Sequence, residues 1–502
     1  MASPMDKIEH VVVAMMENRS FDNLLGWLYA AEGNKAPHVL PAGSSPLFDG
    51  LAGNKFFNKF NSQTIYASQP TSAWPPDNDP FLVPDPDPGE DFNDMTTQIF
   101  GTPNPIPFFN RANMSGFLKD YASIAGDKQA GQIMQTYSPD QVQVISQLAR
   151  NFAVSDQWFA SVPCQTWPNR GFVHTGSSDG HINNDDYEPY DIETIFNVME
   201  KQGISWGVYS NTYVTPSLTH VQFLPRLIGY EDHFHYFTTF EDACQSTDPS
   251  SQLPSYSFVE PRFQPEPTLK IGEVAYPEDY HPPHNVCRGE QFLARLYAAV
   301  RNSPYRDKIL LIITFDEHGG CYDHVPPPGG SVAPLPGPVS RYGGFHFDRF
   351  GVRVPTIVIS SYIQPGTVFR SPTGVPLDHT SILATLRDWQ QMDKNFASPF
   401  LPSPRIQHAP TLDYLLTLSE QDKNTNWPDI PATCNPDSTD ESLSMPINDL
   451  HMSLMIGEAS LRAGVSHIGK EAVAELRQKI KTYQDVIDYF QRAKDSANKH
   501  AL

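Results

Sequence analysis

The stretch from Cys164 to Arg170 holds the first group of residues suited to chemistry. Thr166 stands two residues before Pro168 and four before Arg170. Proline suits a first helical turn, because its missing N–H would have no partner there. Thr166 would then lie at the positive end of a helix, where an anion or a developing alkoxide is stabilised, and the planar Arg170 guanidinium suits phosphate or sulfate oxygens. The alternative is that Thr166 simply caps the helix.

A buried strand that ends in acidic residues is the second group. Residues 309–315 form an unbroken β-branched and aliphatic run, which is typical of a strand covered on both faces. Asp316 and Glu317 follow at once, and open α/β sheets bind ligands at the carboxyl ends of their strands. Adjacent carboxylates repel each other, so we expect a cation beside them.

The same arrangement of strand and polar turn occurs near the start of the chain. Residues 8–16 indicate a buried strand, and Glu17 and Asn18 follow it before an apolar, helix-like segment. The alternative is a strand-end turn in which Ser20 caps the helix. Further on, Asp279 to His284 form a loop that two prolines stiffen, which favours a catalytic or ligand role for His281 and His284.

The elements that would position these residues alternate between strand and helix from about residue 140 to 360. Strands are predicted at 205–210 and 353–360, and helices at 139–150 and 192–199. This alternation predicts an α/β fold with a mainly parallel central sheet. Residues 30–110 are rich in Pro, Asn, Asp and Gly, and we expect long ordered loops there.

The last eighty residues differ in character. We expect a catalytic domain over residues 1–420, a polar linker over 421–446 and a helical region at the C-terminus. One amphipathic helix is predicted after Gly469, and it would pack on the main domain, meet a lipid interface or bind a partner helix. Its apolar stripe consists of Val473, Leu476, Ile480, Tyr483, Ile487 and Phe490.

Composition excludes several classes of function. The net charge of −22 argues against binding to nucleic acid and against electrostatic docking on an anionic bilayer. No apolar run approaches the roughly 18 residues of a transmembrane helix. The start of the chain does not resemble a signal peptide, so we expect a cytoplasmic or peripheral membrane protein, or an exported one whose signal was removed. The five scattered cysteines suggest neither a disulfide framework nor paired zinc ligands, and the oligomeric state stays open.

Four motifs occur together in the order of a known family: Glu17-Asn18-Arg19-Ser20-Phe21-Asp22, Thr166-x-Pro168-Asn169-Arg170, His281-Pro282-Pro283, and Asp316-Glu317-x-Gly319-Gly320 with Tyr322-Asp323-His324-Val325. They resemble the phosphoesterase family of non-specific phospholipases C and related bacterial acid phosphatases, over about residues 6–420. The resemblance implies an alkaline-phosphatase-like three-layer sandwich, and the Thr166 turn is similar to the nucleophile turn of sulfatases. Some relatives have histidine where this chain has Glu90, so we assign Glu90 no role.

The resemblance also implies roles for the residues in these motifs. Thr166 would attack phosphorus in line and form a phospho-threonine intermediate. The metal ligands would be Glu17, Asn18, Thr166, Asp316 and Glu317, which are oxygen donors that suit Ca²⁺ or Mg²⁺ without excluding Zn²⁺. Asn18 would also donate to a phosphate oxygen.

Three further residues receive roles in this scheme. His281 would protonate the leaving alkoxide, and His220 is a second catalytic candidate that would bind phosphoryl oxygens. Arg170 and His284 would bind substrate, with the alternative that Arg170 holds the loop.

Three functions remain open. The first is a phospholipase C that cleaves phosphatidylcholine and similar lipids to diacylglycerol and a phospho-head group. The second is an acid phosphatase or phosphodiesterase that acts on small soluble phosphate esters. The third is a binding protein of the same fold without catalysis, against which the intact Glu17, Thr166, Asp316 and Glu317 argue. At most we expect peripheral membrane contact.

Overall fold

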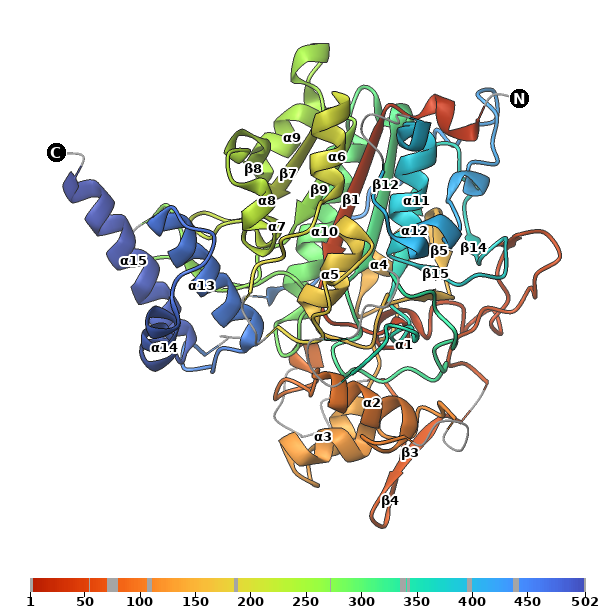
Figure 1. The fold of residues 1–502 in the computed structure, drawn as a ribbon. Helices are drawn as coiled ribbons and strands as arrows, with labels where there is room; N and C mark the ends of the chain where they lie inside the picture. The colour runs from red at the N-terminus through yellow and green to blue at the C-terminus, as the bar shows by residue number, and fades with distance from the viewer. Residues whose placement is uncertain are drawn as a thin grey trace.

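A nine-stranded mixed sheet forms the centre of the molecule (Figure 1), with the strand order β2-β14-β5-β13-β12-β1-β9-β7-β8. The computed structural model describes residues 3–53, 55–69, 80–105, 111–184, 188–270, 272–334, 340, 344–394, 400–436 and 442–500. The strands are β1 His10–Met16, β2 His38–Leu40, β3 Phe57–Phe60, β4 Gln63–Tyr66, β5 Ala153–Ser155, β6 Trp158–Phe159, β7 Trp206–Ser210, β8 Phe234–Tyr236, β9 Tyr256–Glu260, β10 Glu266–Pro267, β11 Val274–Ala275, β12 Ile309–Phe315, β13 Thr356–Ile359, β14 Thr367–Phe369 and β15 Leu377–Asp378.

The register of the two central strands sets the position of the acidic turns. β1 and β12 are parallel and fully buried, and Met16 at the end of β1 lies opposite Phe315 at the end of β12. Glu17 and Asp316 therefore leave the sheet side by side at its carboxyl edge. Strands β9, β7 and β8 continue in parallel, whereas β13 runs antiparallel to both β12 and β5.

Two groups of helices cover the sheet. In one group α4 and α9 pack on α10, and in the other α5 contacts both α6 and α11, which also contacts α12. With the sheet between them they make three layers, which confirms the predicted α/β sandwich. The helices are α1 Phe21–Leu25, α2 Phe92–Phe100, α3 Phe117–Ala125, α4 Gln143–Asn151, α5 Thr166–Thr175, α6 Ile195–Gln202, α7 Leu218–Gln222, α8 Leu224–Leu227, α9 Phe237–Gln245, α10 Val286–Arg301, α11 Thr380–Trp389, α12 Pro404–His408, α13 Asp449–Ala463, α14 Lys470–Lys479 and α15 Tyr483–His500.

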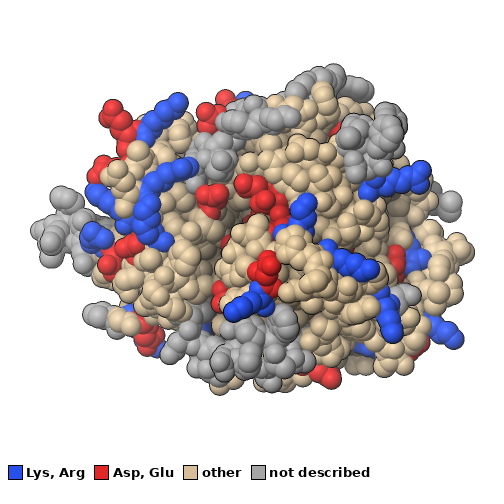
Figure 2. Space-filling model, turned by 90° about the horizontal axis from the view of Figure 1, so that it is seen from below, with Lys and Arg blue, Asp and Glu red and all other residues tan. Residues whose placement is uncertain are grey.

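Part of the region predicted as loops is a small lobe below the sheet, which we call the α2–α3 lobe. It contains α2, α3 and the β3–β4 hairpin, packed around a separate apolar cluster that includes Ile99, Phe117 and Tyr121. The prediction of loops was wrong for α2, because Asp91 and Asp94 form a capping box and Gly101 ends the helix in a left-handed conformation. Seen from below, carboxylates gather in a hollow of this face (Figure 2).

The C-terminal region has three helices, α13, α14 and α15, at one side of the sheet (Figure 1). The prediction of one continuous amphipathic helix was wrong, because the chain leaves helical geometry after Lys479, and Ile480 is already extended. There Lys481 and Tyr483 exchange backbone hydrogen bonds with residues 445–447, and Asp485 accepts from the N–H groups of Lys481 and Thr482. This pairing fixes the break between α14 and α15.

The apolar stripe of this region is covered by other parts of the chain. Ile480, Val486 and Phe490 pack with Met455 of α13 and with Val214 from the main body of the protein. Val486 is fully buried, whereas the predicted Ile487 is half-buried, because the helical phase restarts at Tyr483. The division of the chain at residue 420 stays a prediction. Within the described residues, no helix is long and apolar enough to span a bilayer.

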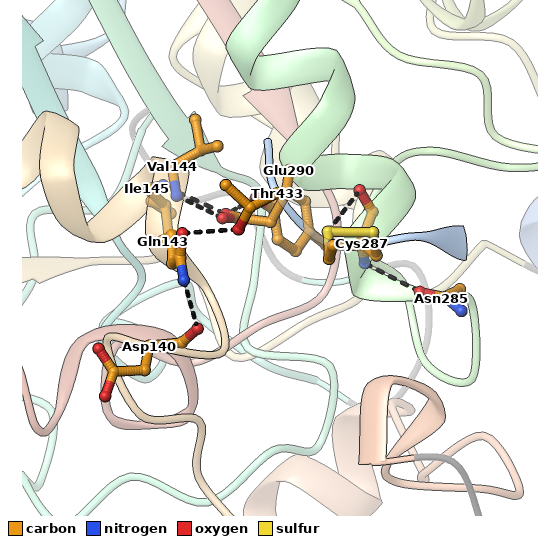
Figure 3. The surroundings of a disulfide bond; sticks show 10 residues. Asp140, Gln143, Val144, Ile145, Asn285, Cys287, Glu290 and Thr433 are labelled. Atoms are coloured by element: carbon orange, nitrogen blue, oxygen red, sulfur yellow. Dashed lines mark hydrogen bonds between the residues drawn. A yellow bond between two sulfur atoms is a disulfide. The ribbon is translucent and has the colours of Figure 1, made fainter. Parts of the chain in front are cut away.

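A disulfide joins Cys287, at the start of α10, to Cys434 across 147 residues of sequence (Figure 3). The sequence indicates no disulfide framework, and this single pair could not be expected, because proximity in the fold does not follow from spacing along the chain. Nearby, Thr433 donates to the side chain of Gln143 on α4, and Trp427 stacks on Tyr297. This part of the predicted linker is therefore fixed to α4 and α10.

Candidate active site

Thr166 is the first residue of α5 and is completely buried. Its hydroxyl Oγ1 donates to Glu17 Oε2 at 3.0 Å and lies 3.4 Å from Asn18 Oδ1. Asn169 holds the turn before the helix by donating to the carbonyl oxygen of Cys164. The hydroxyl is thus fixed at the amino end of a ten-residue helix, as predicted, and faces the acidic turn after β1.

Arg170 lies one turn further along α5 and is also fully buried. Its Nε donates to Glu17 Oε1 at 2.9 Å, its Nη2 contacts the same carboxylate and the carbonyl oxygen of Met15, and its Nη1 lies 3.8 Å from Glu260. Burial raises the pKa of Glu17 well above its ordinary value, and the Arg170 charge opposes that rise. This geometry supports the alternative that Arg170 holds the acidic turn, and substrate binding by Arg170 stays a prediction.

Asp316 and Glu317 complete what we call the Thr166 cluster: Glu17, Asn18, Thr166, Asp316 and Glu317. Asp316 Oδ1 accepts from the backbone N–H of Asn18 at 2.9 Å, and Glu317 Oε2 accepts from that of Gly319 at 2.7 Å. Burial raises the pKa of both carboxyl groups. Their other oxygens, Asp316 Oδ2 and Glu317 Oε1, are buried without a hydrogen-bond partner among the described residues.

The donor set of the Thr166 cluster fits a divalent metal ion. Three buried carboxylates, an amide oxygen and a hydroxyl come from three separate parts of the chain, and all are oxygen donors. Buried carboxylates with unpartnered oxygens are costly unless a cation compensates them. The single arginine that reaches Glu17 does not hydrogen-bond to Asp316 or Glu317 among the described contacts.

The backbone at this site is unusual at two facing positions. Asn18 has a φ of 54°, and Gly319 has a φ of 59°. A Cβ atom added at Gly319 would lie 2.0 Å from the carbonyl oxygen of Asn18. The turn after β12 can therefore approach the turn after β1 only with glycine at this position.

Glu90 and Asp87 belong to the site, although the sequence analysis assigns neither of them a role. Glu90 Oε1 accepts from Asn18 Nδ2 at 2.6 Å and lies 3.6 Å from His281 Nε2, while Asp87 Oδ1 lies 3.6 Å from His281 Nδ1. The three side chains could also hold a metal ion. The only signal in the sequence is the acidic, proline-rich run around residue 87.

The electrostatic setting of His281 follows from these neighbours. Burial alone would lower its pKa, but Asp87 and Glu90 raise it well above the ordinary value. The two carboxylates therefore favour the protonated form of His281, which is the form that an acid for a leaving group requires. Its Nε2 also lies 3.2 Å from the side-chain nitrogen of Asn448, which comes from the C-terminal region.

The two remaining histidines lie outside the Thr166 cluster. His284 is buried between Asp279 and the hydroxyl of Tyr483, at 2.6 Å from each, and burial holds its pKa well below the ordinary value. His220 stacks on Phe234 and lines a different cavity of about 340 Å³. Substrate binding by His284 and phosphoryl binding by His220 remain predictions without direct support from this geometry.

A cleft of about 690 Å³ leads to the site from the face shown in Figure 2. The segment around Asp87 and Glu90 lines this cleft, together with Gln165 and Asn184. Gln165 precedes Thr166 directly. The other lining residues belong to the C-terminal region: Pro446, Ile447, Asn448, Asp449, Leu450, Met452, Arg477, Ile480 and Lys481.

The chain is similar to known phosphoesterases and phospholipases C. The family model described as "Phosphoesterase family" matches residues 8–392. The chain is 31% identical to non-specific phospholipase C3 of Arabidopsis thaliana, over 98% of this chain and 88% of that protein. It is 36% identical to non-specific phospholipase C4 of the same plant, over 76% of this chain and 67% of that protein. It is 23% identical to the non-hemolytic phospholipase C of Burkholderia pseudomallei (strain K96243), over 91% and 66%.

Solved structures give weaker similarities. A protein of the alkaline phosphatase superfamily from Vibrio parahaemolyticus has a TM-score of 0.31 and 14% identity, over 56% of this chain and 65% of that one. The lipoteichoic acid synthase LtaP from Listeria monocytogenes also has a TM-score of 0.31. It is 13% identical, over 54% of this chain and 70% of that one. The fold assignment therefore rests on the order and direction of the strands described above.

Proposed function

We propose that this chain, which belongs to the phosphoesterase family and is a phosphoric ester hydrolase, is a phospholipase C that cleaves phosphatidylcholine and similar glycerophospholipids. The products would be diacylglycerol and a phospho-head group. The relatives named non-specific phospholipase C support this substrate class, at 31–36% identity. The observation that carries the proposal is the buried Thr166 hydroxyl, hydrogen-bonded to Glu17 at the amino end of α5.

Thr166 is the proposed nucleophile. Its Oγ1 donates to Glu17 Oε2, so the proton has an acceptor as the oxygen attacks phosphorus. The bond between phosphorus and the glycerol oxygen breaks, and His281 supplies a proton to that oxygen. Water then cleaves the phospho-threonine and releases the phospho-head group.

The cofactor of this reaction is proposed to be a divalent metal ion, Ca²⁺, Mg²⁺ or Zn²⁺. Glu17, Asn18, Asp316 and Glu317 would hold it together with the Thr166 hydroxyl, as their oxygen chemistry and burial permit. When bound, such an ion polarises a hydroxyl and neutralises charge on phosphoryl oxygens. Arg170 keeps Glu17 in place for both roles.

The charge of the cleft favours a phospholipid over the alternative substrate, a soluble phosphate monoester. Asp87, Glu90, Asp91, Asp94 and Asp449 line the cleft, against Arg477 and Lys481. A dianionic monoester would be repelled by this excess of carboxylates, whereas the cationic end of a phosphatidylcholine head group would be attracted. The acid phosphatase activity is therefore the second candidate.

The products released from phosphatidylcholine test the proposal. Phosphocholine with diacylglycerol is the expected pair, identified by ³¹P NMR and lipid extraction. Choline with phosphatidate would show cleavage of the other ester bond and contradict the proposal. Hydrolysis of p-nitrophenyl phosphate with phosphatidylcholine left intact would favour the acid phosphatase instead.

A further inference from the structure

The β3–β4 hairpin carries two exposed aromatic side chains at opposite positions of its strands. Phe57 is 44% exposed and Tyr66 is 49% exposed, and their rings lie 5.6 Å apart in an edge-to-face arrangement. Lys59 places its ammonium 5.2 Å from the centre of the Phe57 ring. The outward face of the hairpin is therefore aromatic with a cationic side chain beside it.

The inward face of the hairpin explains why these rings are not part of a core. Asn58 is buried and donates to the carbonyl oxygen of Met114, and Phe60 and Ile65 pack on the apolar cluster of the α2–α3 lobe. Side chains alternate between the two faces of a strand, so Phe57, Lys59 and Tyr66 must point away from the lobe. Their exposure follows from a hairpin that is itself well anchored.

The hairpin lies at the same end of the molecule as the catalytic cleft. β3 packs on α3, α3 packs on α2, and the first turn of α2 contributes Asp94 to the wall of the cleft. In Figure 1 the hairpin projects from the lower end, where β1 leads into the site. A flat surface brought against the cleft from below would therefore meet the hairpin.

We propose that the β3–β4 hairpin docks on the surface of a phospholipid bilayer, with Phe57 and Tyr66 entering the head-group region. This inference rests on the proposed phospholipase function, because the reacting phosphate of such a substrate lies at the bilayer surface. Aromatic rings with a neighbouring lysine suit that layer, where one end of the side chain is apolar and the other hydrated. The net charge of −22 gives no long-range attraction to anionic lipid, so attachment depends on short-range apolar contacts of this kind.

The test compares the double variant Phe57→Ser/Tyr66→Ser with Tyr236→Ser. Tyr236 is 58% exposed on β8, at the edge of the central sheet, and serves as the matched control. Flotation with neutral phosphatidylcholine vesicles is measured in a Thr166→Ala background, so that the lipid is not consumed. We expect about tenfold or more weaker partitioning for the double variant, since tenfold corresponds to about 1.4 kcal/mol and burying aromatic surface exceeds that. The control variant should float like the parent.

Activity assays separate this inference from the proposed function. Without the Thr166→Ala change, the double variant should lose about tenfold in hydrolysis of vesicle lipid but keep wild-type turnover of the soluble diester p-nitrophenyl phosphorylcholine. Phe57→Trp/Tyr66→Trp should restore vesicle activity. Unchanged vesicle binding in the double variant would overturn the hairpin inference while the phospholipase proposal stands. If the wild type hydrolyses neither substrate, the proposed function fails first.

A second copy of this chain is the competing occupant of the hairpin face. Light scattering of the wild type and the double variant decides between the two occupants. A monomeric wild type agrees with bilayer docking. A wild-type dimer that dissociates in the double variant would overturn it.

Discussion

Two acidic clusters take their carboxylates from the same two motifs, which follow β1 and β12. The Thr166 cluster takes Glu17 and Asp316 from the first positions after these strands. The second, which we call the Arg353 cluster, consists of Asp22, Asp323, His324 and Arg353. Both are buried and acidic, yet their hydrogen bonding differs.

The Arg353 cluster compensates its own charge. Arg353 donates to Asp22 at 2.9 Å and to Asp323 at 3.0 Å, and His324 Nδ1 lies 2.6 Å from the second oxygen of Asp22. In the Thr166 cluster, by contrast, one oxygen each of Asp316 and Glu317 has no partner among the described residues. The two clusters therefore differ in how far their buried carboxylates are compensated by hydrogen bonds and charge, although both are acidic.

The largest effect should come from Thr166→Ala. We expect hydrolysis to fall by about a thousandfold or more, because the attacking oxygen is lost. The melting temperature should hardly change, since a buried methyl replaces a small polar side chain at the start of α5. Steady-state turnover and thermal unfolding measure both effects. Thr166→Ser should retain activity, and near-native turnover by the alanine variant would contradict the covalent mechanism.

Arg353→Met should destabilise the protein by about 3–5 kcal/mol, because it leaves Asp22 and Asp323 buried without their cation. Urea unfolding followed by fluorescence measures the loss. The fraction that remains folded should keep much of its turnover, because Arg353 does not contact the Thr166 cluster among the described contacts. Loss of activity without loss of stability would mean that the Arg353 cluster takes part in the reaction.

Asp316→Asn should have the opposite effects to Arg353→Met: lost activity with stability kept. We expect about a hundredfold lower activity and weaker metal binding, since an anionic ligand is removed. Stability without metal should stay equal or rise, because a buried carboxylate with an unpartnered oxygen is replaced by a neutral side chain. Metal content by elemental analysis must accompany the assays. A fully active wild-type preparation shown to be free of metal would refute the metal proposal.

The sequence predicts the Thr166 cluster well, because each of its residues follows a strong local pattern. Unbroken apolar strands precede Glu17 and Asp316, and a proline turn surrounds Thr166. Glu90 could not be predicted in the same way, since its approach to Asn18 and His281 depends on how a long proline-rich segment folds back over the sheet. The pairing of Cys287 with Cys434 and the break at Ile480 likewise depend on contacts between segments distant in sequence.

The smallest effect should appear in how the stability that the Arg353 cluster contributes depends on pH. Burial alone would lower the pKa of His324, but Asp22 and Asp49 raise it to about 9. Because the pKa of His324 is higher in the folded protein than its unfolded value of 6.5, its protonation stabilises the fold. This stabilisation is complete below about pH 6.5 and is lost as the pH rises through about 9. The contribution is at most about 3 kcal/mol.

His324→Gln should remove this contribution. We therefore expect the difference in Tm between wild type and His324→Gln to be largest near pH 6.5 and to narrow towards pH 10. The pKa of Asp323 is raised to about 6 by burial, so its titration lies mainly below this window and does not produce the change. A difference in Tm that stays constant from pH 6.5 to 10 would show that His324 is not a charged partner of Asp22. The contrast between the two clusters would then rest on Arg353 alone.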